Sequence, residues 1–267
     1  MLHVLALVAA TTTVEPLVST DWLQAHLSDP QVRVVFTGDE GVYKRGHIPG
    51  ARIVDHMDTI ADNHRLKPFA DLAQIWAHAG VTDGTHVVLY GDSPMTTGWL
   101  FLSLAAIGHG GDVSWLDGNL ELWKREKRPV STDTSKAVSG TLTVHPAPDI
   151  VVDAAYVREH LKAPDVKLLD VRTTQEWNAG HLPGAAFILW QDLFADRDTL
   201  KFKSPDEIRA LLSKVGVEPS QTAVTYCAVG MRASLMYWAA RTVGIPARVY
   251  VGSYSDWQRD SMNPIVR

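Results

Sequence analysis

The most constraining feature of this sequence is an internal duplication. Residues 46–51 read GHIPGA and residues 180–185 read GHLPGA, an offset of 134 positions. The same offset aligns Gly118 with Gly252, and other matches between the halves stay in register apart from a shift of two residues. Solenoid repeats are roughly 20 to 50 residues long, so one repetition at this larger distance predicts two copies of one domain.

Each copy alternates short apolar runs, rich in β-branched residues, with segments of helical periodicity. This alternation predicts an α/β fold of two tandem domains, each a mostly parallel sheet flanked by helices. We place the first domain at residues 14–129, a linker at 130–148 and the second domain at 149–267. Expected strands cover residues 32–36, 87–90, 113–116, 166–170, 222–226 and 248–251, and expected helices begin near Thr20 and Ala154 and cover 72–79, 99–107, 205–215 and 232–243.

The overall charge and the amino terminus limit the partners. With 25 Lys and Arg against 30 Asp and Glu, the formal net charge is -5, the wrong sign for a nucleic-acid binder. The apolar run at residues 4–10 is far shorter than the roughly 20 residues of a membrane span, and is either a frayed or docked strand or part of a secretory signal. We therefore expect no nucleic-acid or membrane partner, and a cytoplasmic protein, or a periplasmic one if residues 1–13 act as a signal.

The chain has one cysteine, Cys227. One cysteine excludes an intramolecular disulfide, a CxxC redox pair and any multi-cysteine zinc site. The 11 histidines form no HxH or HExxH pattern, so we expect no metal and no cofactor. Cys227 is then either a small buried hydrophobe, as most free cysteines are, or a reactive thiol.

The position of Cys227 favours a reactive thiol. It directly follows the expected strand 222–226, and α/β sheets place their ligand sites at the carboxyl ends of strands. The loop 227–232 leads into the next expected helix, so its backbone N–H groups form an anion-binding nest that favours the thiolate. Gly230 allows left-handed backbone there, and Arg232 adds a planar cation suited to a sulfonate, sulfate or phosphate. The residues expected to bind substrate are Ala228, Val229, Gly230, Met231 and Arg232.

Five segments of the second copy match a known family: DVR at 170–172, EW at 176–177, GHLPGA at 180–185, CAVGMR at 227–232 and GSYSDW at 252–257. Through these segments the chain resembles the tandem-domain rhodaneses, which are thiosulfate and 3-mercaptopyruvate sulfurtransferases. The resemblance implies that Cys227 accepts a sulfane sulfur from a small anionic donor as a persulfide. It also implies that the sulfur passes to cyanide or a thiol, and that the first domain is catalytically silent.

The first copy lacks the residues of this predicted site. Gly91 aligns with Cys227, and the DSPMTT that follows contains no arginine. Gly38 aligns with Arg172 and Phe36 with Asp170. An aspartate where the nest should form would repel an anionic donor. The residues themselves therefore also predict a silent first domain.

Asp170 and Arg172 lie at the end of the expected strand 166–170, near the predicted site. They either tune the thiolate electrostatically or serve as a structural ion pair with Glu176 or as a loop anchor. The interior of the loop lacks the basic residue of vertebrate-type rhodaneses. Its C-x-x-G-x-R pattern is similar to that of bacterial enzymes and favours thiosulfate over 3-mercaptopyruvate as donor.

Two other functions stay open from the sequence. A non-catalytic sulfur carrier or partner-binding rhodanese module would use the same thiol. A phosphatase or arsenate reductase of the same fold would need a C-x5-R loop, one residue longer than the C-x4-R span from Cys227 to Arg232. In each case we expect a monomer or a weak homodimer.

Overall fold

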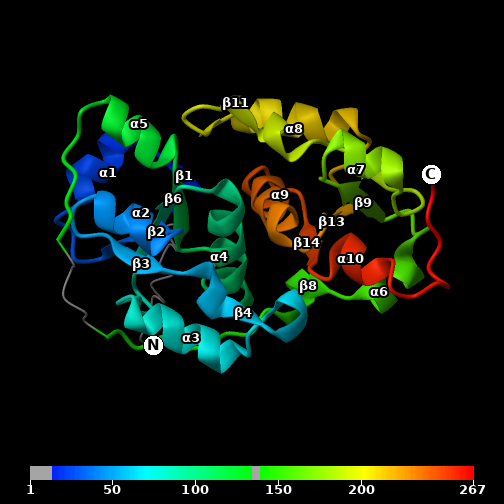
Figure 1. Cartoon of the computed structure of the whole chain (residues 1–267), viewed down its shortest axis with the longest axis horizontal. Coiled ribbons are helices and arrows are strands. Elements are labelled where there is room, and N and C mark those ends of the chain that lie inside the picture. Colours follow the sequence, from blue (N-terminus) through cyan, green and yellow to red (C-terminus); the bar gives the residue numbers. More distant parts are fainter. Residues whose placement is uncertain (1–13, 134–138) are drawn as a thin grey trace, which may run out of the picture.

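The structure, a computed structural model, describes residues 14–133 and 139–267 and consists of two similar α/β domains side by side (Figure 1). Each domain has a five-stranded parallel sheet with helices packed against it, as the duplication predicts. The strand order is β1-β7-β6-β2-β3 in the first sheet, and β10-β9-β13-β14-β8 in the second. Read from opposite ends, these two orders are the same, so the copies share one topology.

The first domain contains β1 (Leu17–Val18), α1 (Thr20–His26), β2 (Val32–Thr37), α2 (Glu40–Arg45), β3 (Arg52–Val54), η1 (His56–Thr59), β4 (Ile60–Ala61), η2 (Asp62–His64), β5 (Arg65–Leu66), α3 (Phe69–His78), β6 (His86–Gly91), α4 (Pro94–Ala106), β7 (Val113–Leu116) and α5 (Asn119–Arg125). The second contains η3 (Pro148–Ile150), β8 (Val151–Val152), α6 (Ala154–His160), β9 (Val166–Asp170), α7 (Thr174–Ala179), β10 (Ala186–Phe187), η4 (Trp190–Leu193), β11 (Phe194–Asp196), β12 (Lys201–Phe202), α8 (Pro205–Lys214), β13 (Thr222–Tyr226), α9 (Met231–Thr242), β14 (Ala247–Tyr250) and α10 (Ser253–Trp257).

Most expected elements lie within two or three residues of their observed bounds, but α4 differs. It begins at Pro94, five residues before the expected start at residue 99. The expectation followed the apolar run and missed the polar first turn. Proline is favoured at the first helical position because its fixed φ suits the helix and its missing N–H is not needed there. By contrast α8 begins at Pro205, as expected, and Ser204 caps it through a capping box with Glu207.

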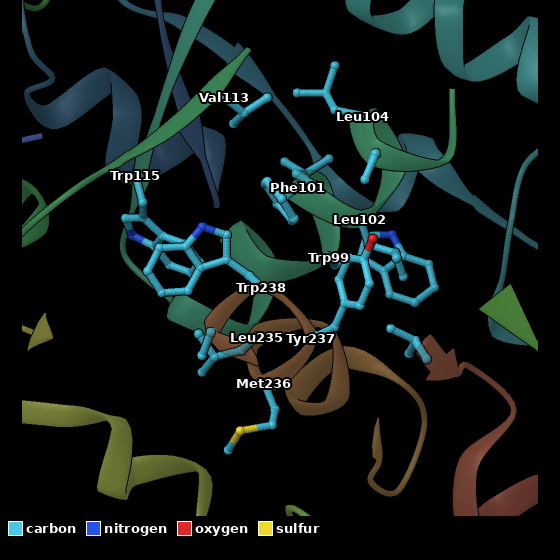
Figure 2. Packing of buried hydrophobic residues seen from close by; sticks show 14 of the residues in the cluster. Trp99, Phe101, Leu102, Leu104, Val113, Trp115, Leu235, Met236, Tyr237 and Trp238 are labelled. Carbon is cyan, nitrogen blue, oxygen red and sulfur yellow. The ribbon is translucent and has the colours of Figure 1, made fainter. Parts of the chain in front are cut away.

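Helices α4 and α9, one from each domain, pack against each other between the two sheets (Figure 1). Figure 2 shows the side chains at this contact, where the Trp115 and Trp238 rings lie 5.0 Å apart between centroids. These residues belong to one buried cluster that extends from α3 and β6 of the first domain to α8 and β13 of the second. The two domains therefore share a hydrophobic core.

The described part of the expected linker lies along the first domain. The Thr143 backbone N–H and hydroxyl both donate to the Asp83 carboxylate, at 2.6 Å each, and the His145 N–H donates to the Ile107 carbonyl. This segment therefore follows the surface of the first domain before the second begins.

The expectations for residues 1–13 lie outside the described residues. In the part of the chain that the structure does describe, no helix combines the length and apolar character that a bilayer crossing requires.

Gly98 lies where the backbones of α4 and α9 come close together. An added β-carbon would lie 2.7 Å from the Leu235 nitrogen and 2.8 Å from its α-carbon, so the helices would have to separate. Overpacking costs about 1–3 kcal/mol, against the roughly 1 kcal/mol that alanine gains over glycine in a helix. We expect Gly98→Ala to lower the free energy of unfolding by about 1–2 kcal/mol in urea denaturation.

The matched control is Gly84→Ala, because a β-carbon there has no atom within 4 Å. It should change the free energy of unfolding by less than about 0.5 kcal/mol. Equal stability of the two variants would contradict the close helix contact.

Candidate active site

The single thiol lies at the end of the central strand of the second sheet. Cys227 directly follows β13, and α9 begins four residues later at Met231. The side chain is buried, with 1% of the residue exposed. We call residues 227–232, which connect β13 to α9, the cysteine loop.

Backbone hydrogen bonds hold the cysteine loop, and one of them reaches the sulfur. The Gly230 N–H donates to Sγ of Cys227 at 3.1 Å, and Gly230 has the left-handed φ of +92° that its position predicts. The Cys227 N–H donates to the Ser253 hydroxyl at 3.1 Å, and the Tyr254 N–H donates to the Cys227 carbonyl. The cysteine loop is therefore held against α10, with an N–H donor directed at the sulfur.

Arg232 is held in place by Glu176. Its two terminal nitrogens donate to the two carboxylate oxygens at 2.7 and 2.8 Å, a bidentate pair. The bonds from Arg232 lower the pKa of Glu176 to about 2, although partial burial acts to raise it. Glu176 also closes a capping box with Thr173 at the start of α7. The arginine that ends the loop is thus largely neutralised within the protein.

Asp170 and Arg172 form a second, fully buried ion pair. Arg172 donates to both Asp170 oxygens, and its Nη2 also donates to the Gly180 carbonyl at 2.7 Å. Its guanidinium carbon lies 4.1 Å from the centroid of the Tyr254 ring. Arg172 therefore anchors the end of β9 to the GHLPGA turn and α10. Of the alternatives left open by the sequence, the contacts match a loop anchor and not an ion pair with Glu176, which pairs with Arg232.

The equivalent position in the first domain has no room for a side chain. A β-carbon at Gly91 would overlap the Thr37 carbonyl and hydroxyl oxygens. The backbone contact is nevertheless kept, because the Gly91 N–H donates to the Asn119 side chain as the Cys227 N–H donates to Ser253. The Asp92 carboxylate fills the space beside Gly38, the position that aligns with Arg172. The two loops thus share a frame and differ in their side chains.

One neighbour of the cysteine loop comes from the first domain and was missed in the sequence. A β-carbon on Gly230 would lie 3.3 Å from the Trp99 ring, whose Nε1 donates to Thr59. Trp99 lies in α4, and only the docking of the domains brings it to the loop. No local pattern around Trp99 could have indicated this contact.

The described residues contain no group of three or more His, Cys, Asp or Glu side chains that could hold a metal ion.

A family model described as the rhodanese-like domain matches residues 19–126 and 153–260. The chain belongs to the rhodanese family. This confirms the resemblance drawn from the five segments of the second copy and the two-domain architecture. The family match covers both copies, including the one that lacks the thiol.

Named relatives are sulfurtransferases and sulfur carriers. The sulfur carrier protein TtuD of Thermus thermophilus is 33% identical over 271 residues, which cover 91% of this chain and 93% of that protein. The thiosulfate sulfurtransferase of Azotobacter vinelandii is 28% identical over 258 residues, covering 91% and 94%. The chain thus belongs to the family of rhodanese-type sulfurtransferases.

A solved structure shows the same fold over both domains. The 3-mercaptopyruvate sulfotransferase SseA of Escherichia coli superposes with a TM-score of 0.80 at 23% identity. The match covers 90% of this chain and 99% of that one.

The Glu176–Arg232 pair predicts a pH dependence of stability. A carboxyl whose pKa is depressed on folding stabilises the protein above its unfolded value, near 4.5, and loses this effect as the pH falls toward 2. We expect Glu176→Gln to be less stable than the wild type by about 1 kcal/mol at pH 7. The difference should shrink between pH 4.5 and 2 in denaturant titrations.

Glu207→Gln is the matched control, since Glu207 closes the same kind of capping box on α8 without an arginine partner among the described residues. Its effect at pH 7 should be smaller. A pH-independent loss in Glu176→Gln would contradict a charge-dependent role for the pair.

Proposed function

We propose that this protein is a thiosulfate sulfurtransferase in which Cys227 carries the transferred sulfur as a persulfide. The observation that carries the proposal is the Gly230 N–H directed at Sγ at 3.1 Å, in a loop that ends on Arg232. N–H donors and a nearby guanidinium stabilise a thiolate, which is the nucleophilic form of cysteine. The surrounding site supplies no second thiol, so a persulfide on Cys227 has no resolving cysteine in the chain.

The proposed reaction has two balanced half-reactions. The Cys227 thiolate attacks the outer sulfur of thiosulfate, an S–S bond forms, and the S–S bond of thiosulfate breaks with its electron pair leaving on sulfite. Cyanide then attacks the outer sulfur of the persulfide, thiocyanate leaves, and the thiolate is regenerated. A thiol acceptor would take the sulfur in the same way. No general base takes part in the proposed reaction, because the thiolate itself is the attacking nucleophile.

The structure supports separate roles for the residues around this thiol. Gly230 directs its N–H at the sulfur, while Ala228, Val229 and Met231 add no charged side chain to the loop. Arg232 lies close enough to Cys227 to interact with it electrostatically and is oriented by Glu176. The Asp170–Arg172 pair acts at one remove, by anchoring the surrounding turns. The first domain, where Gly91 replaces the cysteine, is silent in this proposal.

A sulfur-carrier role is the second candidate, because the relative of 33% identity is named as a sulfur carrier. A carrier would use the same persulfide on Cys227 but would release its sulfur to a protein acceptor. The two functions differ in turnover with small acceptors. An enzyme makes many thiocyanates per protein, whereas a carrier stops near one.

The persulfide is directly measurable. Incubation with thiosulfate should add one sulfur, about 32 Da, to the intact protein, and cyanide should remove it with formation of thiocyanate. Cys227→Ser should show neither the mass increase nor turnover, while keeping its denaturation curve close to that of the wild type. Sulfur transfer by Cys227→Ser, or hydrolysis of p-nitrophenyl phosphate in place of thiocyanate formation, would refute the proposal.

The donor preference is tested by comparing kcat/KM for thiosulfate and 3-mercaptopyruvate with cyanide as the common acceptor. We expect thiosulfate to be preferred by about 10-fold or more, roughly 1.4 kcal/mol of transition-state binding. A preference for 3-mercaptopyruvate would keep the sulfurtransferase chemistry and reverse the donor assignment.

A further inference from the structure

Each domain places one β-hairpin against the other domain, and the two hairpins are equivalent in the duplication. The β11–β12 hairpin of the second domain contacts the end of β7 in the first, where the Phe202 N–H donates to the Asp117 carboxylate at 2.9 Å. The β4–β5 hairpin of the first domain lies beside β8 and the end of β14 in the second (Figure 1). Leu66 and Phe202 hold equivalent positions, because Leu66 pairs with Ile60 in one hairpin as Phe202 pairs with Phe194 in the other. Arg65 and Lys201, the residues just before them, are equivalent in the same way. Each domain therefore places a basic residue near the end of the equivalent strand of the other domain, β7 in the first and β14 in the second.

The residue that follows β7 near Lys201 differs from the residue that follows β14 near Arg65. In the first domain Asp117 follows β7, and Lys201 acts on its buried carboxyl, opposing the rise in pKa that burial causes. In the second domain Val251 takes the place of Asp117 after β14. Arg65 has no ion pair among the described residues. Lys201 thus acts on a carboxylate of the first domain, whereas Arg65, at the second domain, stays available to a ligand.

Arg65 opens onto a cavity that adjoins the cysteine loop. The cavity has a volume of about 210 Å³ and is lined by Arg65 and His64 of the first domain and by Val229, Gly252, Ser255, Asp256 and Arg259 of the second. We call it the mouth cavity. Its size is below the roughly 300–1,000 Å³ of sites for drug-sized ligands, and suits a small molecule.

The charges lining the mouth cavity favour an anion. Arg259 has no ion pair within the described residues, and neither does Arg65. The Asp256 carboxylate accepts a hydrogen bond from the Tyr250 hydroxyl at 2.8 Å. Two arginines against one aspartate give the lining of the cavity a net positive charge.

The backbone before Arg65 is held in an unusual conformation. His64 has a left-handed φ of +56°, which is uncommon for a residue with a side chain and occurs mainly where surrounding structure enforces it. This residue ends η2 and turns the chain into β5. The turn that brings Arg65 to the second domain thus requires an unfavourable backbone conformation at His64.

We propose that Arg65 of the first domain, together with Arg259, binds the anionic part of the sulfur donor in the mouth cavity. The proposal deepens the proposed function. Because Arg232 is already paired with both oxygens of Glu176, the loop has little free positive charge for a dianion such as thiosulfate. The two arginines of the mouth cavity supply it. The first domain, silent in the chemistry, would then contribute to substrate binding.

Arg65→Gln and Lys201→Gln form a matched pair that tests this, since the two residues are equivalent in the duplication and both are exposed. We expect Arg65→Gln to raise KM for thiosulfate about 10-fold with kcat nearly unchanged, as loss of one charge-assisted contact implies. Arg65→Lys should recover part of the loss, because it keeps the charge. Lys201→Gln should match the wild type. Equal KM values for the two glutamine variants would overturn the proposal.

Single-turnover measurements separate donor from acceptor. The concentration of thiosulfate that half-saturates persulfide formation should rise in Arg65→Gln, while transfer from preformed persulfide to cyanide should be unchanged. A defect confined to the second step would overturn binding of the donor. Calorimetric titration of thiosulfate into Cys227→Ser, with and without Arg65→Gln, tests the site even if no persulfide forms. Equal affinities there would refute the site, whereas absence of persulfide in the wild type would refute only the proposed function.

Discussion

The close contact between α4 and α9 is the constraint on which the rest of the molecule depends. Gly98 allows the α4 backbone to approach Leu235 of α9 so closely that a β-carbon would not fit. These are the helices that follow the two equivalent loops, at Gly91 and at Cys227. Packing them together brings the two loops to the domain interface and buries one shared core. The site is thus a product of docking as well as of the second domain.

A second consequence of this docking is that equivalent parts acquired different roles. The Gly91 and Cys227 N–H groups are both held by the residue that follows a β-strand and a glycine, Asn119 and Ser253, each with a positive φ. The backbone frame is therefore the same in both copies. The copies differ in the space beside this position, because the Thr37 carbonyl and hydroxyl oxygens of the first copy would overlap a β-carbon at Gly91.

The charges around the thiol are arranged in layers. The Asp170–Arg172 pair is fully buried and satisfied by further hydrogen bonds, which is what a buried pair requires if it is not to destabilise the protein. Glu176 and Arg232 form the next layer, partly exposed and bidentate. Outside them lies the mouth cavity, where neither Arg65 nor Arg259 forms an ion pair with any residue that the structure describes. The arginines nearest the core are thus paired with carboxylates, and those at the surface, from which a substrate would enter, are not.

Much of the fold was predictable, because each half of the sequence could be compared with the other half. Strand β13 and the capped start of α8 agree with the sequence prediction. The start of α4 was missed because a polar first turn carries no apolar periodicity. The cysteine loop was found through its position after a strand, its glycine and its arginine. The partner of Arg232 was not, because several acidic residues lie within reach in sequence and only their orientation decides which one pairs.

The sequence by itself therefore determined the two α/β copies, the family, and the loop that holds Cys227, because these depend on local patterns and on the comparison of one half with the other. The tertiary structure alone decided the neighbours of that loop. Trp99 and Arg65 come from the first domain, more than a hundred residues away. Arg232, the last residue of the loop, pairs with Glu176. Such contacts arise from the angle and distance at which two packed domains meet, and no spacing along the chain records them.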